Sequence, residues 1–443
     1  MKLHDIFFWL ACFFLAGVLI ASVTSGLTAP YFPAAAAIVA ICATLFIFDK
    51  RLLAALGLSM FLGAAFYFFS DSLSLKREIV FDQKVEFTGI IREAEQRISS
   101  QMLRVGNART RIQIVTSRYP SFEYGDEIKI RGVIKSPEGE WAWYFKKEGV
   151  AGLVSFPEIE LISKDSGSPI MAALFKIKGF FKESFKKVLP FEQAAFMAGL
   201  TLGDTSEFSD EFEEKLRASG TSHLVALSGY NISIIVRALA VILGGWWLTK
   251  RFKFPLTVTF ILAFVVMTGA EASVVRAAIM AGLVLVADQV RRPYHFRNAV
   301  AAAALLMVLP SPNILAFDIG FQLSFAALIG IVYLEPWLRK KLKISKDAGV
   351  LGWRKNLMTT TSAQLAVLPL LIYHFGFVSP LGILANVLIL EFIPITMALG
   401  FFMAFASLIS GGLAWLISWP ANAFLAYEIG IINLCSKILS LLI

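Results

Sequence analysis

The sequence predicts a polytopic α-helical membrane protein that carries one inserted, small, extracytoplasmic β-domain. Of its 443 residues, 57% are hydrophobic and 16% are charged, whereas a soluble chain has about 25% charged residues. Apolar runs long enough to cross a bilayer recur along the chain, so we expect about 10–12 transmembrane or re-entrant helices. One segment of about 90 residues lacks such runs and has the strand pattern of a separate small domain.

This pattern divides the chain into four regions. They are a three-span N-terminal anchor, the β-domain, an amphipathic interfacial helix and a polytopic helical domain, at residues 1–70, 71–168, 169–190 and 191–443. No convincing small-residue cleavage site follows the first apolar run, at 6–24, and further spans at 34–48 and 52–69 follow it. We therefore interpret the first run as a retained anchor rather than a signal peptide.

The β-domain is predicted from short β-branched runs that are separated by Gly and Pro turns. Its clearest piece, YGDEIKIRGVI, begins with a turn and continues as an alternating strand. A five-stranded OB-like barrel, the oligonucleotide-binding type, fits this pattern. Strand spacing alone does not select such a barrel over a small sandwich.

Arginine and aromatic residues in the β-domain suit either a nucleic-acid groove or the solvated face of a small barrel. Lys and Arg number 15 against 14 Asp and Glu between 71 and 164, so any attraction for phosphate has to be local. Tyr119, Phe122 and Tyr124 lie near the arginines and would offer rings for base stacking. The arginines are Arg92, Arg97, Arg104, Arg109, Arg111 and Arg118.

The segment 170–190 has apolar residues at helical spacing, interrupted by five lysines. This pattern is typical of a helix that lies in the membrane interface. We expect its aromatic stripe to face lipid or to pack in the core.

Eight further spans are predicted, at 223–248, 255–270, 273–290, 298–309, 313–334, 356–373, 380–409 and 413–442. The last two are long and contain Pro394 and Pro420, so each is expected to be broken or kinked. Lys and Arg gather in the loops 249–254, 291–297 and 335–355, which places these loops and the N-terminus in the cytoplasm. The net charge of +9 therefore reflects membrane topology more than the nature of any ligand.

Polar residues cluster toward the outer ends of several predicted spans. Such residues are costly in a bilayer unless they have a partner or face water, so we expect them to line a funnel that opens toward the β-domain. The alternative for each is a hydrogen bond between helices, with Arg276 facing Asp318 or water. The predicted lining residues are His223, Ser228, Gly229, Asn231, Glu271, Arg276, Asp318, Gln322, Ser324 and Gln364.

The sequence gives little support to enzyme chemistry. It has no GxSxG, HExxH, paired GxGD or Walker-type motif, and its three cysteines show no metal-ligand or disulfide spacing. An intramembrane hydrolase centred on Ser228 remains an alternative, although five helical positions would turn His223 away from Ser228. No cofactor, metal ion or catalytic residue is predicted.

Five motifs resemble ComEC-type competence proteins, and they occur in that family's order. They are FEQAAFMAGLTLGDTSEF, SGTSHLVALSGYNISIIV, GAEASVVRAAIM, FDIGFQLSFAALIGIVYL and AQLAVLPLLIYHFG followed by LANVLI. The resemblance picks out His223, Ser228, Gly229, Arg276, Gln322 and Ser324 as the family's motif positions. Tyr230 and Asn231 depart from it, because the family usually has Leu-His there.

The resemblance implies an inner-membrane channel that carries single-stranded DNA into the cytoplasm during natural transformation. It implies single-stranded DNA and the lipid bilayer as partners, together with a separate DNA receptor, a cytosolic motor and a nuclease. The chain lacks the metallo-β-lactamase-like domain that many members carry, so no nuclease activity is expected from it. The alternative is a small-molecule or ion transporter with the β-domain as an external cap.

Overall fold

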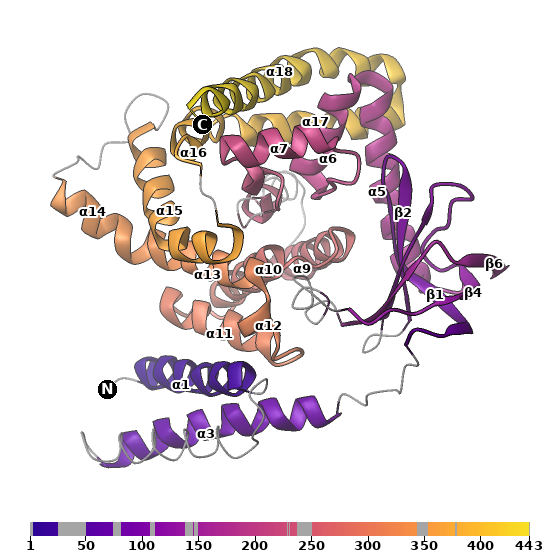
Figure 1. Ribbon diagram of the computed structural model, residues 1–443. Helices are drawn as coiled ribbons and strands as arrows, with labels where there is room; N and C mark the ends of the chain where they lie inside the picture. Colours follow the sequence, from indigo (N-terminus) through magenta and orange to yellow (C-terminus); the bar gives the residue numbers. More distant parts are fainter. Residues whose placement is uncertain are drawn as a thin grey trace.

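The structure is a computed structural model that describes residues 3–24, 50–73, 81–106, 111–137, 145, 149–227, 229, 231–236, 250–342, 353–376 and 379–442. It confirms the predicted fold class: the chain is mostly helical, with a small six-stranded sheet domain near the N-terminus (Figure 1). Among the described residues, five helices are long and apolar enough to cross a membrane, or six if one bent pair counts as a span. The predicted span at 34–48 lies outside the described residues.

The described part of the N-terminal anchor contains two helices, α1 (Leu3–Thr24) and α3 (Lys50–Leu73), which pack side by side (Figure 1). Glycines permit their close contact. A Cβ atom on Gly17 would lie 1.9 Å from the carbonyl oxygen of Met60, and one on Gly63 would lie 2.1 Å from that of Phe14. Small residues at such crossings let backbones approach where lipid gives no hydrophobic driving force.

We expect Gly63→Ala to destabilise the anchor by about 1–3 kcal/mol, because the added methyl group forces the two backbones apart. Thermal unfolding of the purified full chain, followed by tryptophan fluorescence, measures the effect. Gly282→Ala is the matched control, since Gly282 is also in an apolar helix but a Cβ there meets nothing within 4 Å. Equal stability of the two variants would contradict the tight crossing.

The β-domain is a sheet with the order β5-β3-β2-β1-β4-β6. Its strands are β1 (Lys84–Gln96), β2 (Ser100–Gly106), β3 (Arg111–Ser117), β4 (Glu127–Val133), β5 (Val150–Ser155) and β6 (Glu158–Ser163). The long strand β1 pairs with β4 along its first half and with β2 along its second half, while β3 and β5 are parallel. An antiparallel bridge between Lys135 and Leu153 joins the end of β4 to β5, which curls the sheet into a small barrel. Alternate residues such as Ile91, Leu103 and Ile114 fill its interior.

The predicted interfacial helix is α5 (Pro169–Val188), and its aromatic stripe packs in the core. Phe181 and Phe185 are buried, and the Phe181 ring lies 6.0 Å from that of Phe401 and 5.7 Å from that of Phe405. Helix α6 (Phe191–Leu202) follows and ends at Gly203, whose φ of +68° suits glycine. The acidic helix α7 (Asp210–Ser219) starts at the N-cap Ser209, whose hydroxyl accepts a hydrogen bond from the Phe212 amide.

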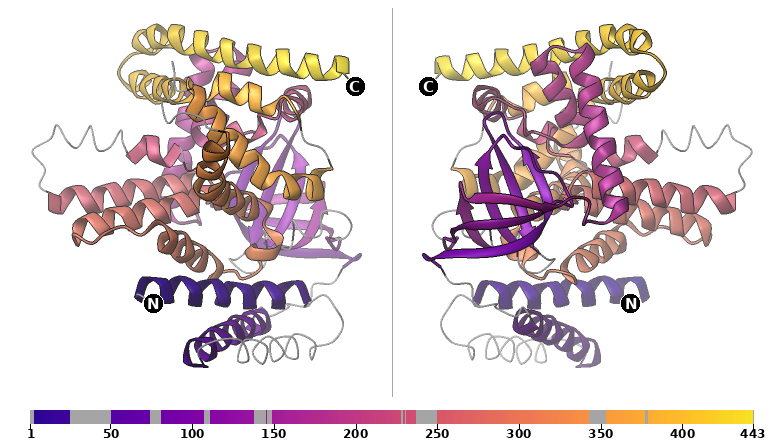
Figure 2. Two further views of the ribbon diagram at one scale, coloured as in Figure 1. Left: turned by 90° about the vertical axis from the view of Figure 1, so that its left-hand side faces the viewer. Right: turned by 90° about the vertical axis from the view of Figure 1, so that its right-hand side faces the viewer.

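The remaining helices complete the membrane-embedded body. They are η1 (Ser222–Leu224), α9 (Lys250–Met267), α10 (Ala272–Gln289), α11 (Phe296–Val308), α12 (Ile314–Phe317), α13 (Ile319–Ile329), η2 (Gly330–Leu334), α14 (Glu335–Lys341), α15 (Trp353–Phe375), α16 (Gly382–Ile389), α17 (Ile393–Ile409) and α18 (Gly411–Leu442). Figure 2 shows α18 and the α1–α3 pair on opposite sides of this body, with the β-domain beside its middle.

Two of the predicted spans have a different form from that expected. The predicted start of the span 223–248 is the 3₁₀ turn η1, because Gly220 ends α7 in the left-handed conformation and the chain turns there. Helix resumes at 231–236, and 237–249 lie outside the described residues. The predicted break in 380–409 is confirmed as a 53° bend between α16 and α17, whereas α18 continues as one helix past Pro420.

Candidate functional site

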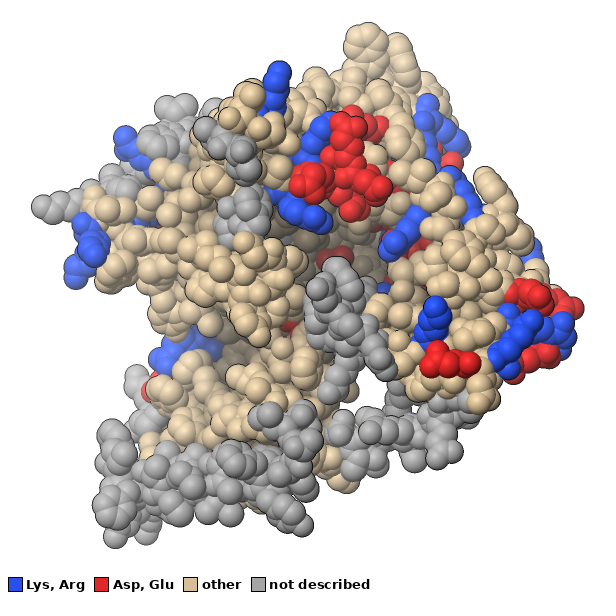
Figure 3. All heavy atoms as spheres, in the orientation of Figure 1, with Lys and Arg blue, Asp and Glu red and all other residues tan. Residues whose placement is uncertain are grey.

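A cavity of about 2770 Å³ lies between the β-domain and the helical body. Its wall includes the second half of β1, the lysine face of α5, the loop after α6 and faces of α10, α13, α15 and α16. Figure 3 shows the hollow on this face of the molecule, with acidic and basic side chains around it. The two predicted sites, one in the β-domain and one in the helices, therefore share a single cavity.

One face of α15 lines this cavity along most of the helix. The lining residues are spaced four and three apart, which places them on one side: Thr360, Gln364, Val367, Leu371 and His374. The helix has 23 residues, so it is about 34 Å long, close to the thickness of the hydrocarbon core. The part of α15 that lines the cavity, residues 359–375, has 17 residues and is about 25 Å long, which is most of that thickness.

The charges around the cavity nearly balance. Among the described residues, its lining contains eleven Lys and Arg against ten Asp and Glu, and five of the nine cations from the β-domain and α5 are paired with carboxylates. The cavity as a whole therefore has no strong preference for anions, and any attraction for phosphate must be local.

A buried ion-pair network fixes α5 to the loop after α6. Lys182 Nζ donates a 3.0 Å hydrogen bond to Asp204 Oδ1, and Lys178 Nζ lies 3.1 Å from Asp204 Oδ2. Glu207 pairs with Lys182 at 3.2 Å and with Lys186 at 2.8 Å. Burial would raise the pKa of the Asp204 carboxyl, but the two ammonium groups outweigh it and hold that pKa well below its usual range.

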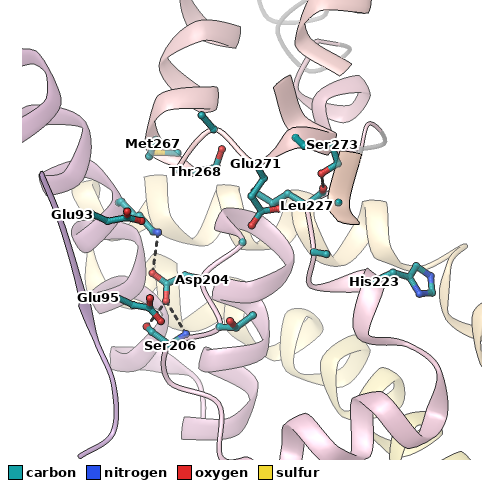
Figure 4. A pocket seen from close by; sticks show the side chains of 18 of the residues that line it. Glu93, Glu95, Asp204, Ser206, His223, Leu227, Met267, Thr268, Glu271 and Ser273 are labelled. Carbon is teal, nitrogen blue, oxygen red and sulfur yellow. Dashed lines mark hydrogen bonds and ion pairs between the residues drawn. The ribbon is translucent and has the colours of Figure 1, made fainter. Parts of the chain in front are cut away.

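Figure 4 shows this part of the wall from close by. Glu93 and Glu95 extend from β1 on one side, and Asp204 and Ser206 lie across from them on the loop. Glu271 lies on the far side of Asp204, and the His223 ring points away from the acidic group. The β-domain and the helical body thus meet across a polar gap.

Arg276 lies in the membrane-embedded part of the cavity, on α10. Its Nη1 donates a hydrogen bond to the backbone carbonyl of Ser324, and the guanidinium lies 5.7 Å from the centroid of the Phe325 ring. Its Nε is buried without a hydrogen-bond partner in the described parts of the chain, and no carboxylate there forms an ion pair with it. The alternative predicted from the sequence was that Arg276 faces Asp318 or water. In the structure the guanidinium instead donates its hydrogen bond to the Ser324 carbonyl.

Gly229 leaves room beside this guanidinium. A Cβ atom at Gly229 would lie 3.8 Å from Arg276 Nη2 and 3.3 Å from Ala277 Cβ. The distance to Ala277 is the tight one, so the small residue lets the helix that follows η1 approach α10 next to Arg276.

Most of the other predicted lining residues also border the cavity. Asp318 is the N-cap of α13 and accepts a 2.9 Å hydrogen bond from the Phe321 amide. The remaining members that border the cavity are His223, Gly229, Glu271, Arg276, Ser324 and Gln364.

Asn231 and Gln322 are placed elsewhere. Asn231 is 4% exposed and its Nδ2 donates a 3.1 Å hydrogen bond to the carbonyl of Leu200, which joins its helix to α6. Gln322 Nε2 donates to the carbonyl of Ala316 at 2.8 Å, and its Oε1 lies 3.3 Å from His374 Nε2. Both residues connect elements, which is the alternative that the sequence left open.

Four of the predicted β-domain arginines border the cavity: Arg92, Arg97, Arg104 and Arg111. Arg104 is 7% exposed and pairs with Glu93 at 2.7 Å, so it is held within the domain. Arg118 does not line the cavity; it donates to the Ile98 carbonyl and lies beside the Tyr119 ring.

The expected aromatic platform is smaller than the sequence suggested. Phe122 and Tyr124 are 5% and 9% exposed, because their rings pack inside the barrel and against α5. Of the three, Tyr119 is the one that is exposed, at 74%.

Two predicted residues, Ser228 and Arg109, lie outside the described residues. The ion-pair network of Lys178, Lys182 and Asp204 was not predicted from the sequence. The Gly203-Asp204 pair at the end of an apolar helix is the feature of the sequence that indicates a functional position there. The sequence predicts that α5 lies in the membrane interface, and the structure adds that two of its lysines, Lys178 and Lys182, pair with a carboxylate in the cavity wall.

Comparison with known proteins shows the family of the chain. A family model described as "Competence protein" matches residues 200–442, which is more than half of the chain. The chain is 31% identical over 205 residues to ComE operon protein 3 of Bacillus subtilis (strain 168), and this covers 46% of the chain but only 25% of that protein. No solved structure matches. The family model and the membrane-embedded body together show that the chain belongs to the competence protein family.

Proposed function

We propose that this protein passes single-stranded DNA through its cavity into the cytoplasm during natural transformation. The observation that carries the proposal is the continuous cavity, which begins at β-domain arginines and follows one face of α15 as far as Thr359. Its volume of about 2770 Å³ exceeds the 300–1,000 Å³ of a usual small-molecule pocket, which favours a polymeric substrate.

The lining suits a single strand in particular. Apolar side chains such as Val266, Leu328 and Leu371 alternate around the wall with polar ones, including Gln364. A single strand exposes its bases to apolar contact as well as its phosphates to polar contact, whereas a duplex hides the base faces. In this arrangement Arg276 contacts a phosphate within the membrane.

The proposal includes an orientation and partners. The β-domain and α5 face the cell exterior or periplasm, and the N-terminus and the basic end of α14, with Arg339, Lys340 and Lys341, face the cytoplasm. A receptor that delivers DNA, a motor and a nuclease are supplied by other chains.

A bulky residue inside the cavity tests the path. Ala363 lines the cavity on α15, whereas Leu365 is 46% exposed on another face of the same helix. We expect Ala363→Trp to reduce the amount of labelled DNA that enters the cytoplasm of a competent host to that of the gene deletion, because the indole fills the path. We expect Leu365→Trp to support normal uptake at equal membrane levels.

Two outcomes would contradict the proposal. Normal uptake by Ala363→Trp would show that DNA does not pass along this face of α15. Normal uptake after deletion of the gene would show that the protein does not serve DNA entry.

A further inference from the structure

A polar subsite lies in the cavity wall at the start of α16. Ser379 precedes α16 and Asn386 lies within it; both line the cavity and are 5% and 1% exposed. Ser379 Oγ and Asn386 Oδ1 are buried and have no hydrogen-bond partner in the described parts of the chain. Buried polar atoms are nearly always satisfied in folded proteins, so two orphaned ones in one wall indicate a ligand.

The backbone around these residues is held in a fixed position by glycine. A Cβ atom at Gly220 would lie 2.8 Å from the Cα of Gly382 and 3.1 Å from Ser379 Cβ. Gly220 also has a φ of +71°, which other residues rarely adopt. The end of α7 therefore presses against the start of α16 and positions Ser379 next to it.

The start of α16 adds donors to the same place. The first amides of a helix have no partner within it, and the N-terminus carries a partial positive charge. In α16 the Gly382 amide already donates to the Ser379 carbonyl at 3.3 Å, so the donors available to a ligand are the amides that follow it in the first turn. Leu381 occupies the N-cap and provides no side-chain hydrogen bond. Gln364 of α15 also reaches this point, because its Nε2 lies 3.8 Å from where a Cβ on Gly382 would be. Such a set of neutral donors at a helix N-terminus fits a phosphate group.

We propose that Ser379, Asn386, Gln364 and the first turn of α16 form a subsite for one phosphodiester group of the DNA strand. The inference rests on the proposed function and assigns residues to it that carry no charge. Half a turn about the last side-chain bond of Asn386 presents its NH₂ group to a phosphate oxygen. A neutral subsite holds each phosphate without a strong ion pair, so the strand can leave as easily as it enters.

The test uses the purified full chain in lipid nanodiscs and a fluorescent oligodeoxythymidylate, with binding measured by anisotropy at low and high salt. Asn386→Asp keeps the shape of the side chain but places a negative charge beside the phosphate. We expect it to weaken binding about 10-fold at low salt and much less at high salt, since screening reduces the repulsion. Ser379→Ala is expected to weaken binding at both salt concentrations.

Ser362→Ala is the matched control, because Ser362 is also fully buried with an orphaned hydroxyl but does not line the cavity. Binding of both subsite variants with wild-type affinity would overturn the subsite, and so would losses equal to that of the control. Either result leaves the proposed function standing if the wild-type protein binds the oligonucleotide. No binding by the folded wild-type protein would contradict both proposals.

Discussion

Replacement of Arg276 by glutamine is expected to lower DNA uptake about 10- to 100-fold while the protein still reaches the membrane. The guanidinium has an unpartnered Nε in the described parts of the chain and no carboxylate pair there, so it keeps a charge available for a phosphate. The measurement is the amount of labelled DNA protected inside a competent host, at matched membrane levels of the protein.

The control for Arg276 separates the phosphate contact from packing. Arg276 also donates a hydrogen bond to the Ser324 carbonyl, so its replacement can lower stability. The unfolding temperature of each purified variant is therefore compared with that of the wild-type protein. Arg297→Gln removes the same charge from an arginine that stacks on Phe8, 4.2 Å from the ring centroid, and does not line the cavity. We expect Arg297→Gln to take up DNA normally. Equal losses in both variants would contradict a specific role for Arg276.

Asp204→Asn is expected to destabilise the protein by about 3–5 kcal/mol, because the Lys178 ammonium then stays buried without a carboxylate and Lys182 keeps only Glu207. The side chains of Lys182 and Lys178 are 15% and 22% exposed, so water replaces little of the lost interaction. Thermal unfolding of the purified chain measures the change. Glu211→Gln is the control, since its pair with Lys215 is on the surface and we expect almost no effect.

The same network predicts a dependence on pH. The pKa of Asp204 is lower in the folded than in the unfolded protein, so its contribution is complete above the unfolded pKa of about 3.9. The contribution is lost as the pH falls below that value toward the folded pKa. Wild-type and Asp204→Asn proteins should therefore approach each other in stability as the solution is acidified below pH 4. A constant difference down to strongly acidic pH would contradict the assignment.

Much of the fold follows from local patterns that a sequence shows directly. The alternation in YGDEIKIRGVI predicts β4, because strand residues point alternately to the two faces of a sheet. Apolar length predicts α1 and α10, because a helix in lipid must bond its own backbone over the whole bilayer. The break near Pro394 was also predictable, since proline cannot continue a helix without losing a hydrogen bond.

The same kind of reasoning gives the set of polar residues in the spans but not their separate roles. Arg276, Gln364 and Asn231 all looked like lining residues, yet Asn231 is turned toward the Leu200 carbonyl of α6. The rotation of each helix about its axis decides whether a polar side chain faces a neighbouring helix or the cavity. That rotation depends on contacts such as the glycine crossings, which involve partners far away in the sequence.

The sequence by itself determined the membrane class, the position of the β-domain and the family of the chain, because these depend on hydropathy, strand period and motif order. Only the tertiary structure decided that α5 lysines pair with Asp204, that Phe122 is inside the barrel and Tyr124 packs against α5, and that Gly220 packs against Gly382 beside Ser379. These features arise where segments distant in the chain pack together. Packing decides whether each buried polar group finds a hydrogen-bond partner, and the sequence of one segment does not show which other segment will provide that partner.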